Sequence, residues 1–147
     1  MEFDIVVKMN IYETIAETAQ APTAAEVARA LDRSIQEVGT AFQRLSQKRL
    51  LVLEPGDATR IRMAPPFSGI KTTHRVTVDG ADYYANCAWD AFGVAAALGR
   101  DADITSTCPD CNRRLDLQIR DGQPLPNPAV AHFAVPAAHW WDDIIYT

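Results

Sequence analysis

The sequence predicts an α+β fold, in which a helical first part is followed by a part built mostly of strands. Two observations carry this prediction. Apolar residues recur at helical spacing in the first third of the chain, and short β-rich runs separated by turn residues fill most of the rest. The change falls at Pro65-Pro66, so we predict that the 147 residues divide into domains 1–66 and 67–147 that pack together.

Composition excludes several classes of protein. The chain is 48% hydrophobic and has no apolar run near the roughly 20 residues that a membrane helix needs, so neither disorder nor a membrane span is expected. We also expect no signal peptide, because the start lacks a basic segment followed by an apolar one. The net charge of −5 disfavours general attraction to nucleic acid. An odd number of cysteines, three, disfavours a disulfide framework and favours reduced thiols in the cytoplasm.

The first part contains signals for three helices and a hairpin. Apolar residues from Ile11 to Ala19 predict a first helix, which ends before Pro22. Two capping boxes, in which a hydroxyl and a carboxylate satisfy free amides, predict the starts of two more helices. They are formed by Thr23 with Glu26 and by Ser34 with Glu37. Residues 50–53 and 60–62 then predict a strand-turn-strand unit, and this order is typical of a winged helix-turn-helix.

A winged helix would make DNA binding the first hypothesis for residues 1–66. Residues 34–49 would then form the recognition helix. Its cations come late, and its first turns, which would contact bases, offer little positive charge. The cations are Arg44, Lys48 and Arg49, and the early polar residues are Gln36, Glu37 and Thr40. We therefore expect no DNA partner and favour a scaffold role for this part.

The second part is predicted to contain a small mixed sheet. Asp79-Gly80 between two β-rich runs is a strong hairpin signal, and Gly99 is placed to end a small-residue helix over 91–98. Residues 103–106 and 115–119 are expected to be strands, and 121–128 a loop. A last strand over 130–135 and a short helix in the tail, 139–147, closing the sheet, complete the prediction.

Cys87 and Asp90 are the first candidate site. Cys87 follows a predicted strand and lies close to a helix start, where backbone amides and the helix dipole would lower the pKa of its thiol. Asp90, three residues later, would share its helix face. A thiol beside a carboxylate suits soft-metal chemistry, in which sulfur holds the metal and oxygen carries a proton. The alternative is a small buried cysteine beside an ordinary first-turn acid.

Cys108-Pro109-Asp110-Cys111 is the second candidate. Two such thiolates can supply half of a tetrahedral zinc site, but the rest would have to come from Cys87 or the histidines His74, His132 and His139. We expect no zinc at Cys108 and Cys111. A redox dithiol is disfavoured because the motif does not open a helix, which leaves a turn with two packed thiols. His132 and His139 are expected to be structural, and Trp140 and Trp141 to cover the site or fill a core edge.

The stretch from Pro66 to Cys108 resembles the organomercurial (alkylmercury) lyase family, the MerB-like proteins. The resemblance rests on Pro66-Phe67, on residues 75–80, on the run from Tyr84 to Asp90 and on residues 97–100, with a weaker echo at 132–136. A helical domain resembling a winged helix also precedes this stretch in the family, where it serves as a scaffold.

The resemblance implies cleavage of carbon–mercury bonds by protonolysis, with no added cofactor and with mercury as the substrate metal. One thiolate takes the mercury, a second adds electron density, and a carboxylate handles the proton. Matched by motif, Cys87 is the first thiol, Asp90 the acid and Cys108 a structural cysteine. The family places its second catalytic cysteine just before His132-Phe133, where this chain has no cysteine.

Three hypotheses follow from this departure. The chain is a lyase acting through Cys87 and Asp90, with Cys111 as a substitute second thiol; or it binds a thiophilic metal ion or small molecule without turnover; or it is a winged-helix regulator that senses a ligand at Cys87. A metal set of Cys87, Cys108 and Cys111 is the corresponding expectation for binding. The sequence makes no prediction of the oligomeric state.

Overall fold

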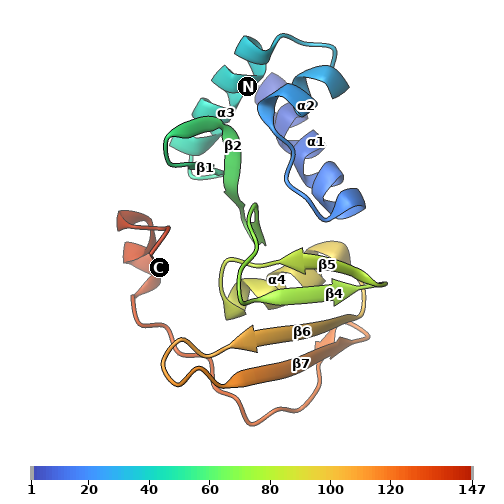
Figure 1. The fold of residues 1–147 in the computed structure, drawn as a ribbon, viewed down its shortest axis with the longest axis vertical. Helices are drawn as coiled ribbons and strands as arrows, with labels where there is room; N and C mark the ends of the chain where they lie inside the picture. The colour runs from blue at the N-terminus through green and yellow to red at the C-terminus, as the bar shows by residue number, and fades with distance from the viewer. Residues whose placement is uncertain (1, 147) are drawn as a thin grey trace.

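The computed structural model describes residues 2–146 and confirms the α+β class (Figure 1). Three helices come first and lead into a small antiparallel sheet of order β1-β2-β3. The helices are α1 (Glu2–Thr18), α2 (Ala24–Ala30) and α3 (Ile35–Gln47). The strands of the small sheet are β1 (Val52–Glu54), β2 (Asp57–Ala64) and β3 (Phe67–Ser68).

Both predicted capping boxes are confirmed. The Thr23 hydroxyl accepts from the Glu26 N–H at the start of α2, and the Glu26 carboxylate accepts from the Thr23 N–H in return. Ser34 and Glu37 make the same reciprocal pair at the start of α3. The starts of α2 and α3 could therefore be predicted from the sequence, because a capping box involves residues only three positions apart.

The second part is a sheet of order β5-β4-β6-β7-β8 with one helix packed against it. Its elements are β4 (Arg75–Val78), β5 (Ala81–Tyr84), α4 (Ala88–Leu98), β6 (Ala102–Thr107), β7 (Arg114–Arg120) and β8 (Gln123–Pro124). The expectation of a mixed sheet is wrong, since every pair of neighbours is antiparallel. After α4 the chain returns beside β4 rather than β5, and this placement makes the new pair antiparallel.

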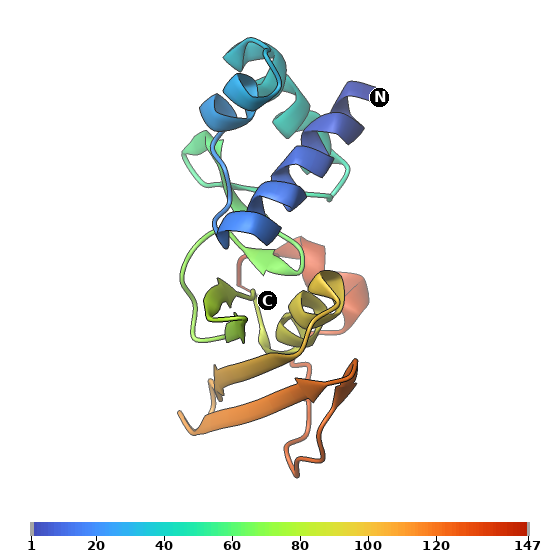
Figure 2. The same cartoon turned by 90° about the vertical axis from the view of Figure 1, so that its right-hand side faces the viewer.

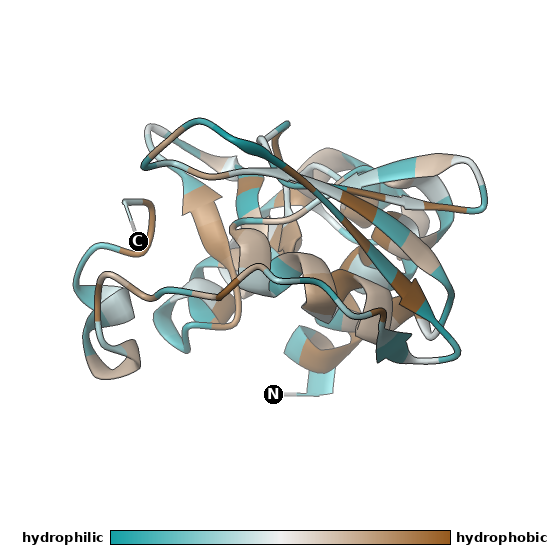
Figure 3. Ribbon diagram, turned by 90° about the horizontal axis from the view of Figure 1, so that it is seen from below, coloured by the Kyte–Doolittle hydropathy of each residue, from teal (hydrophilic) through white to brown (hydrophobic). Residues whose placement is uncertain are grey.

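Alternation along the strands shows which face of this sheet is buried. In β6, Ala102, Ile104 and Ser106 are buried while the residues between them are more exposed. Helix α4 contacts β4, β6 and β3, and it ends at Gly99, whose φ of 62° is the left-handed conformation that glycine adopts readily. Figure 2 shows α4 between the helices at one end and β6 and β7 at the other. Apolar stretches lie along both strands and helices in Figure 3.

Two predictions for the end of the chain are wrong. The expected loop 121–128 contains the short strand β8, which a turn at Asp121-Gly122 brings back onto β7. The expected strand 130–135 is absent from the described chain, where Val130 is 88% exposed and no strand pairs with it. The tail does contain a short helix, the 3₁₀ helix Ala137–Asp142. Its Trp141 ring lies under Arg49, after α3, so the tail does not extend the sheet.

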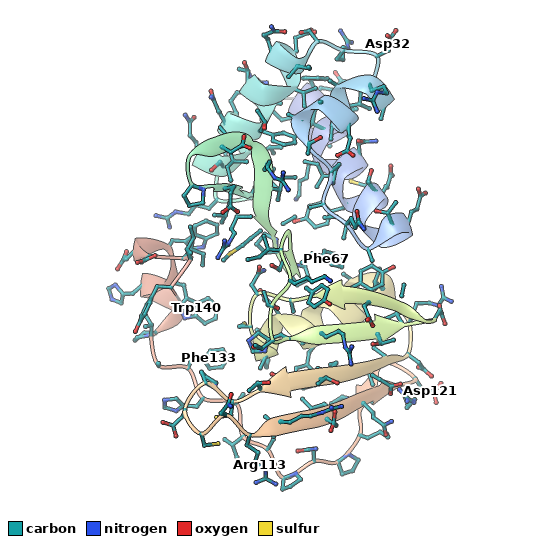
Figure 4. All side chains as sticks on the ribbon, viewed as in Figure 1. Asp32, Phe67, Arg113, Asp121, Phe133 and Trp140 are labelled. Atoms are coloured by element: carbon teal, nitrogen blue, oxygen red, sulfur yellow. The ribbon has the colours of Figure 1, made fainter. Side chains whose placement is uncertain are left out.

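The two parts meet at Pro65–Phe67. The Tyr12 hydroxyl of α1 donates to the Pro65 carbonyl at 2.9 Å, and the Tyr83 hydroxyl of β5 donates to the Ala16 carbonyl at 2.6 Å. The ring of Phe67, labelled in Figure 4, lies 6.2 Å from the Tyr12 ring and 6.1 Å from the Tyr83 ring, measured between centroids. One hydrophobic core runs through both parts. The segment Pro65–Phe67 therefore lies in direct contact with both parts of the chain.

Asp4 fastens α1 to α3. Its carboxylate is 3% exposed and accepts hydrogen bonds from Arg44, as close as 2.6 Å, and from Lys48 at 3.3 Å. These contacts, chiefly the one with Arg44, lower the pKa of Asp4 to about 2. Two of the cations that a DNA-binding α3 would need are thus paired with Asp4.

We expect Asp4→Asn to lower the free energy of unfolding by about 1–2 kcal/mol, because hydrogen bonds to charged partners are lost. The pKa of Asp4 is lower in the folded chain than in the unfolded one, so its contribution is present above about pH 4 and is lost as the pH falls towards 2. Urea unfolding of both proteins across this range checks the prediction. A difference that grows as the pH falls would contradict it.

None of the helices in residues 2–146 combines the length and apolarity needed to cross a membrane.

Candidate active site

Cys87 caps the amino end of α4. Its backbone is extended, with φ −150° and ψ 176°, and its sulfur accepts a hydrogen bond from the Asp90 N–H at 3.4 Å. A serine or threonine usually has this role, so a thiol here lies directly beside the first turn of the helix. The predicted juxtaposition of Cys87 and Asp90 is thus present in the structure, and both side chains are half-buried.

Within residues 2–146, one side chain donates a hydrogen bond to the Asp90 carboxylate. The Asn86 amide nitrogen donates to Asp90 Oδ2 at 3.0 Å. Burial raises the pKa of the Asp90 carboxyl, and the hydrogen bond from Asn86 only partly opposes this. A carboxyl in this setting takes up and holds a proton more readily than an exposed aspartate does.

The predicted lowering of the Cys87 pKa is wrong. Burial raises the pKa of the thiol, and the nearby Asp90 carboxylate raises it further. Hydrogen bonds from the backbone N–H groups of Asp90 and Trp89 act in the opposite direction and are outweighed. Helix position alone was a poor guide because the site is also desolvated and contains a carboxylate.

Asn86 is a site residue that no sequence motif indicated by itself. Its amide nitrogen also lies 3.3 Å from the carbonyl oxygens of Pro66 and Phe67, while its buried Oδ1 has no hydrogen-bond partner within residues 2–146. A Cβ added at Gly93 would lie 2.9 Å from Pro66 Cβ, so α4 sits directly on the same segment. The junction between the two parts therefore supports Asn86 and, through it, Asp90. Adjacency to Cys87 was the only signal in the sequence.

An aromatic row lies beside the site, formed by Trp89, Phe133 and Trp140. Trp89 is in the first turn of α4 and its ring centroid lies 5.8 Å from that of Phe133, which in turn lies 5.5 Å from Trp140. Figure 4 shows Phe133 and Trp140 on the carboxy-terminal segment. Trp89 is still 56% exposed, so the row forms an accessible apolar surface one residue from Asp90.

The other two cysteines lie in the connection between β6 and β7. Cys108 is half-buried and Cys111 is exposed. Within residues 2–146 no three His, Cys, Asp or Glu side chains come together as a metal site, so Cys87, Cys108 and Cys111 are not assembled into a three-ligand set. Cys87, Asp90 and Cys111 likewise do not form such a group in the described part of the chain. The role of Cys111 as a second thiol for Cys87 therefore stays a prediction.

Two of the histidines have structural contacts. His74 Nδ1 lies 2.7 Å from the buried Ser106 hydroxyl, and burial lowers the pKa of its ring, which favours the neutral form. His139 pairs with Asp142 within the 3₁₀ helix at 2.9 Å.

The fold and site together define an α+β protein with a thiol and a carboxyl on the first turn of one helix. The family model described as alkylmercury lyase matches residues 67–147, so the chain belongs to the alkylmercury lyase family. A solved structure, the mercury-bound form of MerB2, shares its fold with a TM-score of 0.69 and 23% sequence identity. The alignment covers 86% of this chain and only 60% of that one. No curated protein gives a significant match.

Proposed function

We propose that this chain cleaves carbon–mercury bonds, with Cys87 binding the mercury and Asp90 carrying the proton. The observation that supports this most directly is the pair itself: the two groups share one helix turn, and Asp90 has a raised pKa. The solved relative is described only as binding mercury, and this chain spans 60% of its length. The activity is therefore an inference from family membership and from this geometry.

The proposed reaction has two steps. The Cys87 sulfur forms a bond to mercury and displaces its outgoing ligand, and the thiol proton passes to the Asp90 carboxylate. Asp90 then gives that proton to the carbon, the carbon–mercury bond breaks with its electron pair on carbon, and the hydrocarbon leaves. Mercury stays on Cys87 as a divalent ion. Burial favours both steps, because it makes Asp90 a better proton acceptor and keeps its proton from solvent.

The remaining mercury ion needs a second donor. The segment Pro124–Val130, where the family has its second catalytic cysteine, has none here and is exposed throughout. We propose that the Asp90 carboxylate, freed of its proton, holds the ion until a small-molecule thiol from solution removes it. The alternative donor is Cys111, and Cys111→Ser separates the two, since only the alternative loses activity in excess thiol.

The organic group of the substrate would lie on the aromatic row. Trp89, Phe133 and Trp140 offer apolar ring faces next to the reacting pair. An aryl or alkyl group gains by leaving water for such a surface. We therefore propose small organomercurial cations as the substrate class.

Incubation with phenylmercury and excess small thiol tests the proposal. We expect benzene, measured by gas chromatography, and free inorganic mercury in equal amounts over many turnovers. A second candidate function is retention without cleavage, favoured by the lack of a cysteine in Pro124–Val130, which leaves Cys87 without the second thiol of the family. It predicts one bound phenylmercury per chain and no benzene, a result that would refute the lyase proposal.

We propose a scaffold role for the helical part and no DNA partner. Arg44 and Lys48 are held by Asp4, and Arg49 lies over the Trp141 ring. These are the cations that a recognition helix would direct to phosphates. A reducing compartment such as the cytoplasm suits a protein whose three cysteines are all free.

We expect Asn86→Ala to lower kcat by roughly tenfold, a typical cost when a supporting hydrogen bond to a site residue is lost. The hydrogen bond from Asn86 lowers the pKa of Asp90, so its removal raises that pKa further. The acid limb of the pH–rate profile should therefore move to higher pH. A fall in kcat with an unmoved acid limb would mean that Asn86 acts only on the fold.

A further inference from the structure

The turn at Cys108–Cys111 is a feature that the proposed lyase chemistry does not use. It closes the β6–β7 connection: the Cys108 N–H donates to the Arg113 carbonyl, and the Asn112 N–H donates to the Cys108 carbonyl, each at 2.9 Å. Asn112 has a φ of 57°, the left-handed conformation that reverses the chain. Backbone hydrogen bonds between Cys108 and residues 112 and 113 therefore hold the turn that contains the two thiols.

The two thiols of this turn are in contact with each other. The backbone N–H groups of Cys111 and Asp110 and the Cys111 thiol all interact with the Cys108 sulfur. Cys108 is half-buried and Cys111 exposed, so a solute can reach the pair from solvent.

The number of donors selects the kind of ion. Zinc in a structural site takes four ligands, and the described residues bring no third His, Cys, Asp or Glu into a group with this pair. Two thiolates alone suit a soft cation that accepts low coordination, because thiolate selects soft metals. Metal–sulfur bonds of about 2.3 Å span sulfurs up to roughly 4.6 Å apart, a separation accessible to two thiols in one turn.

We propose that Cys108 and Cys111 form a two-thiolate site for a soft, thiophilic cation such as Hg²⁺, separate from the Cys87–Asp90 pair. Binding forms two sulfur–metal bonds and releases the two thiol protons to solvent, with no change of oxidation state. The site does not depend on cleavage at Cys87. Its fixed turn favours chelation, because the second sulfur binds within the same chain at a high effective concentration.

Three single variants test the site, because each leaves a different pair of the three cysteines. Cys87→Ser leaves Cys108 with Cys111, Cys108→Ser leaves Cys87 with Cys111, and Cys111→Ser leaves Cys87 with Cys108. Each reduced protein is titrated with Hg²⁺ without oxygen, followed by the ultraviolet thiolate-to-mercury absorption and by native mass spectrometry. Competition with glutathione then measures retention, and Cys108→Ala replaces Cys108→Ser if the hydroxyl disturbs folding.

We expect only Cys87→Ser to bind one Hg²⁺ per monomer tightly, with roughly 100-fold better retention than the other two variants. Equal retention by all three, or by none, would overturn the proposal. So would tighter binding by Cys108→Ser, which would pair Cys111 with Cys87, or one ion bridging two chains. Tighter binding of Zn²⁺ than of Hg²⁺ by Cys87→Ser would equally overturn it. Because Cys87 is absent from the decisive variant, failure of the lyase proposal leaves this result unaffected.

Discussion

Cys87→Ser is expected to abolish turnover of phenylmercury, with a loss of roughly 1,000-fold or more, equal to about 4 kcal/mol of transition-state stabilisation. The hydroxyl can still accept the Asp90 N–H and cap α4, so the fold and the position of Asp90 are kept. What is lost is the soft donor, because oxygen binds mercury far less well than sulfur does. Benzene release under excess thiol is the measurement.

Cys111→Ser is the matched control. It makes the same sulfur-to-oxygen change at an exposed position outside the helix cap. If the second donor comes from solution, this variant keeps wild-type turnover while it loses the mercury site proposed for the β6–β7 turn. Residual activity of more than about a tenth in Cys87→Ser would show that another group takes the mercury, and the site assignment would fail.

The local parts of the fold could be predicted from the sequence. The capping boxes at Thr23 and Ser34 and the hairpin at Asp79-Gly80 depend on residues a few positions apart, and the structure contains all three. The antiparallel pairing of β6 with β4 could not be predicted in this way, because it depends on where the chain returns after α4. The same holds for residues 130–135, where Phe133 packs on Trp89 instead of joining the sheet.

The candidate site shows the same division. The spacing of Cys87 and Asp90 implied one helix face, and they lie together. Burial could not be inferred from spacing, and burial decides the direction of both pKa shifts. Asn86 was missed because its role depends on Pro66 and Phe67, about twenty residues earlier in the chain. A site at the junction of two parts contains contacts that no local pattern records.

Asp90→Asn is expected to lower kcat by roughly 100-fold or more, the usual contribution of a positioned proton donor, and to leave the first capture of the organomercurial cation by the Cys87 sulfur intact. In the wild type, the proposed reaction needs Asp90 ionised to take the thiol proton and one proton on the pair to give to carbon. Activity should therefore rise through the raised pKa of Asp90 and fall through the raised pKa of Cys87. The bell-shaped pH–rate profile should therefore lie at higher pH than the ordinary pKa values of an aspartate and a cysteine would place it. Because the two groups interact, the apparent pKa values of its two limbs belong to the pair and not to either residue alone.

The variant separates this catalytic role from a structural one. Asparagine can still accept from Asn86, but it carries no proton, so the acid limb should disappear along with most of the activity. Stability should move in the opposite direction. Because burial raises the pKa of Asp90 in the folded chain, its ionised form destabilises the fold at pH 7, and Asp90→Asn should melt at the same or a higher temperature. An inactive variant that melts well below the wild type would indicate structural damage, and full activity with an unchanged acid limb would exclude Asp90 as the proton carrier.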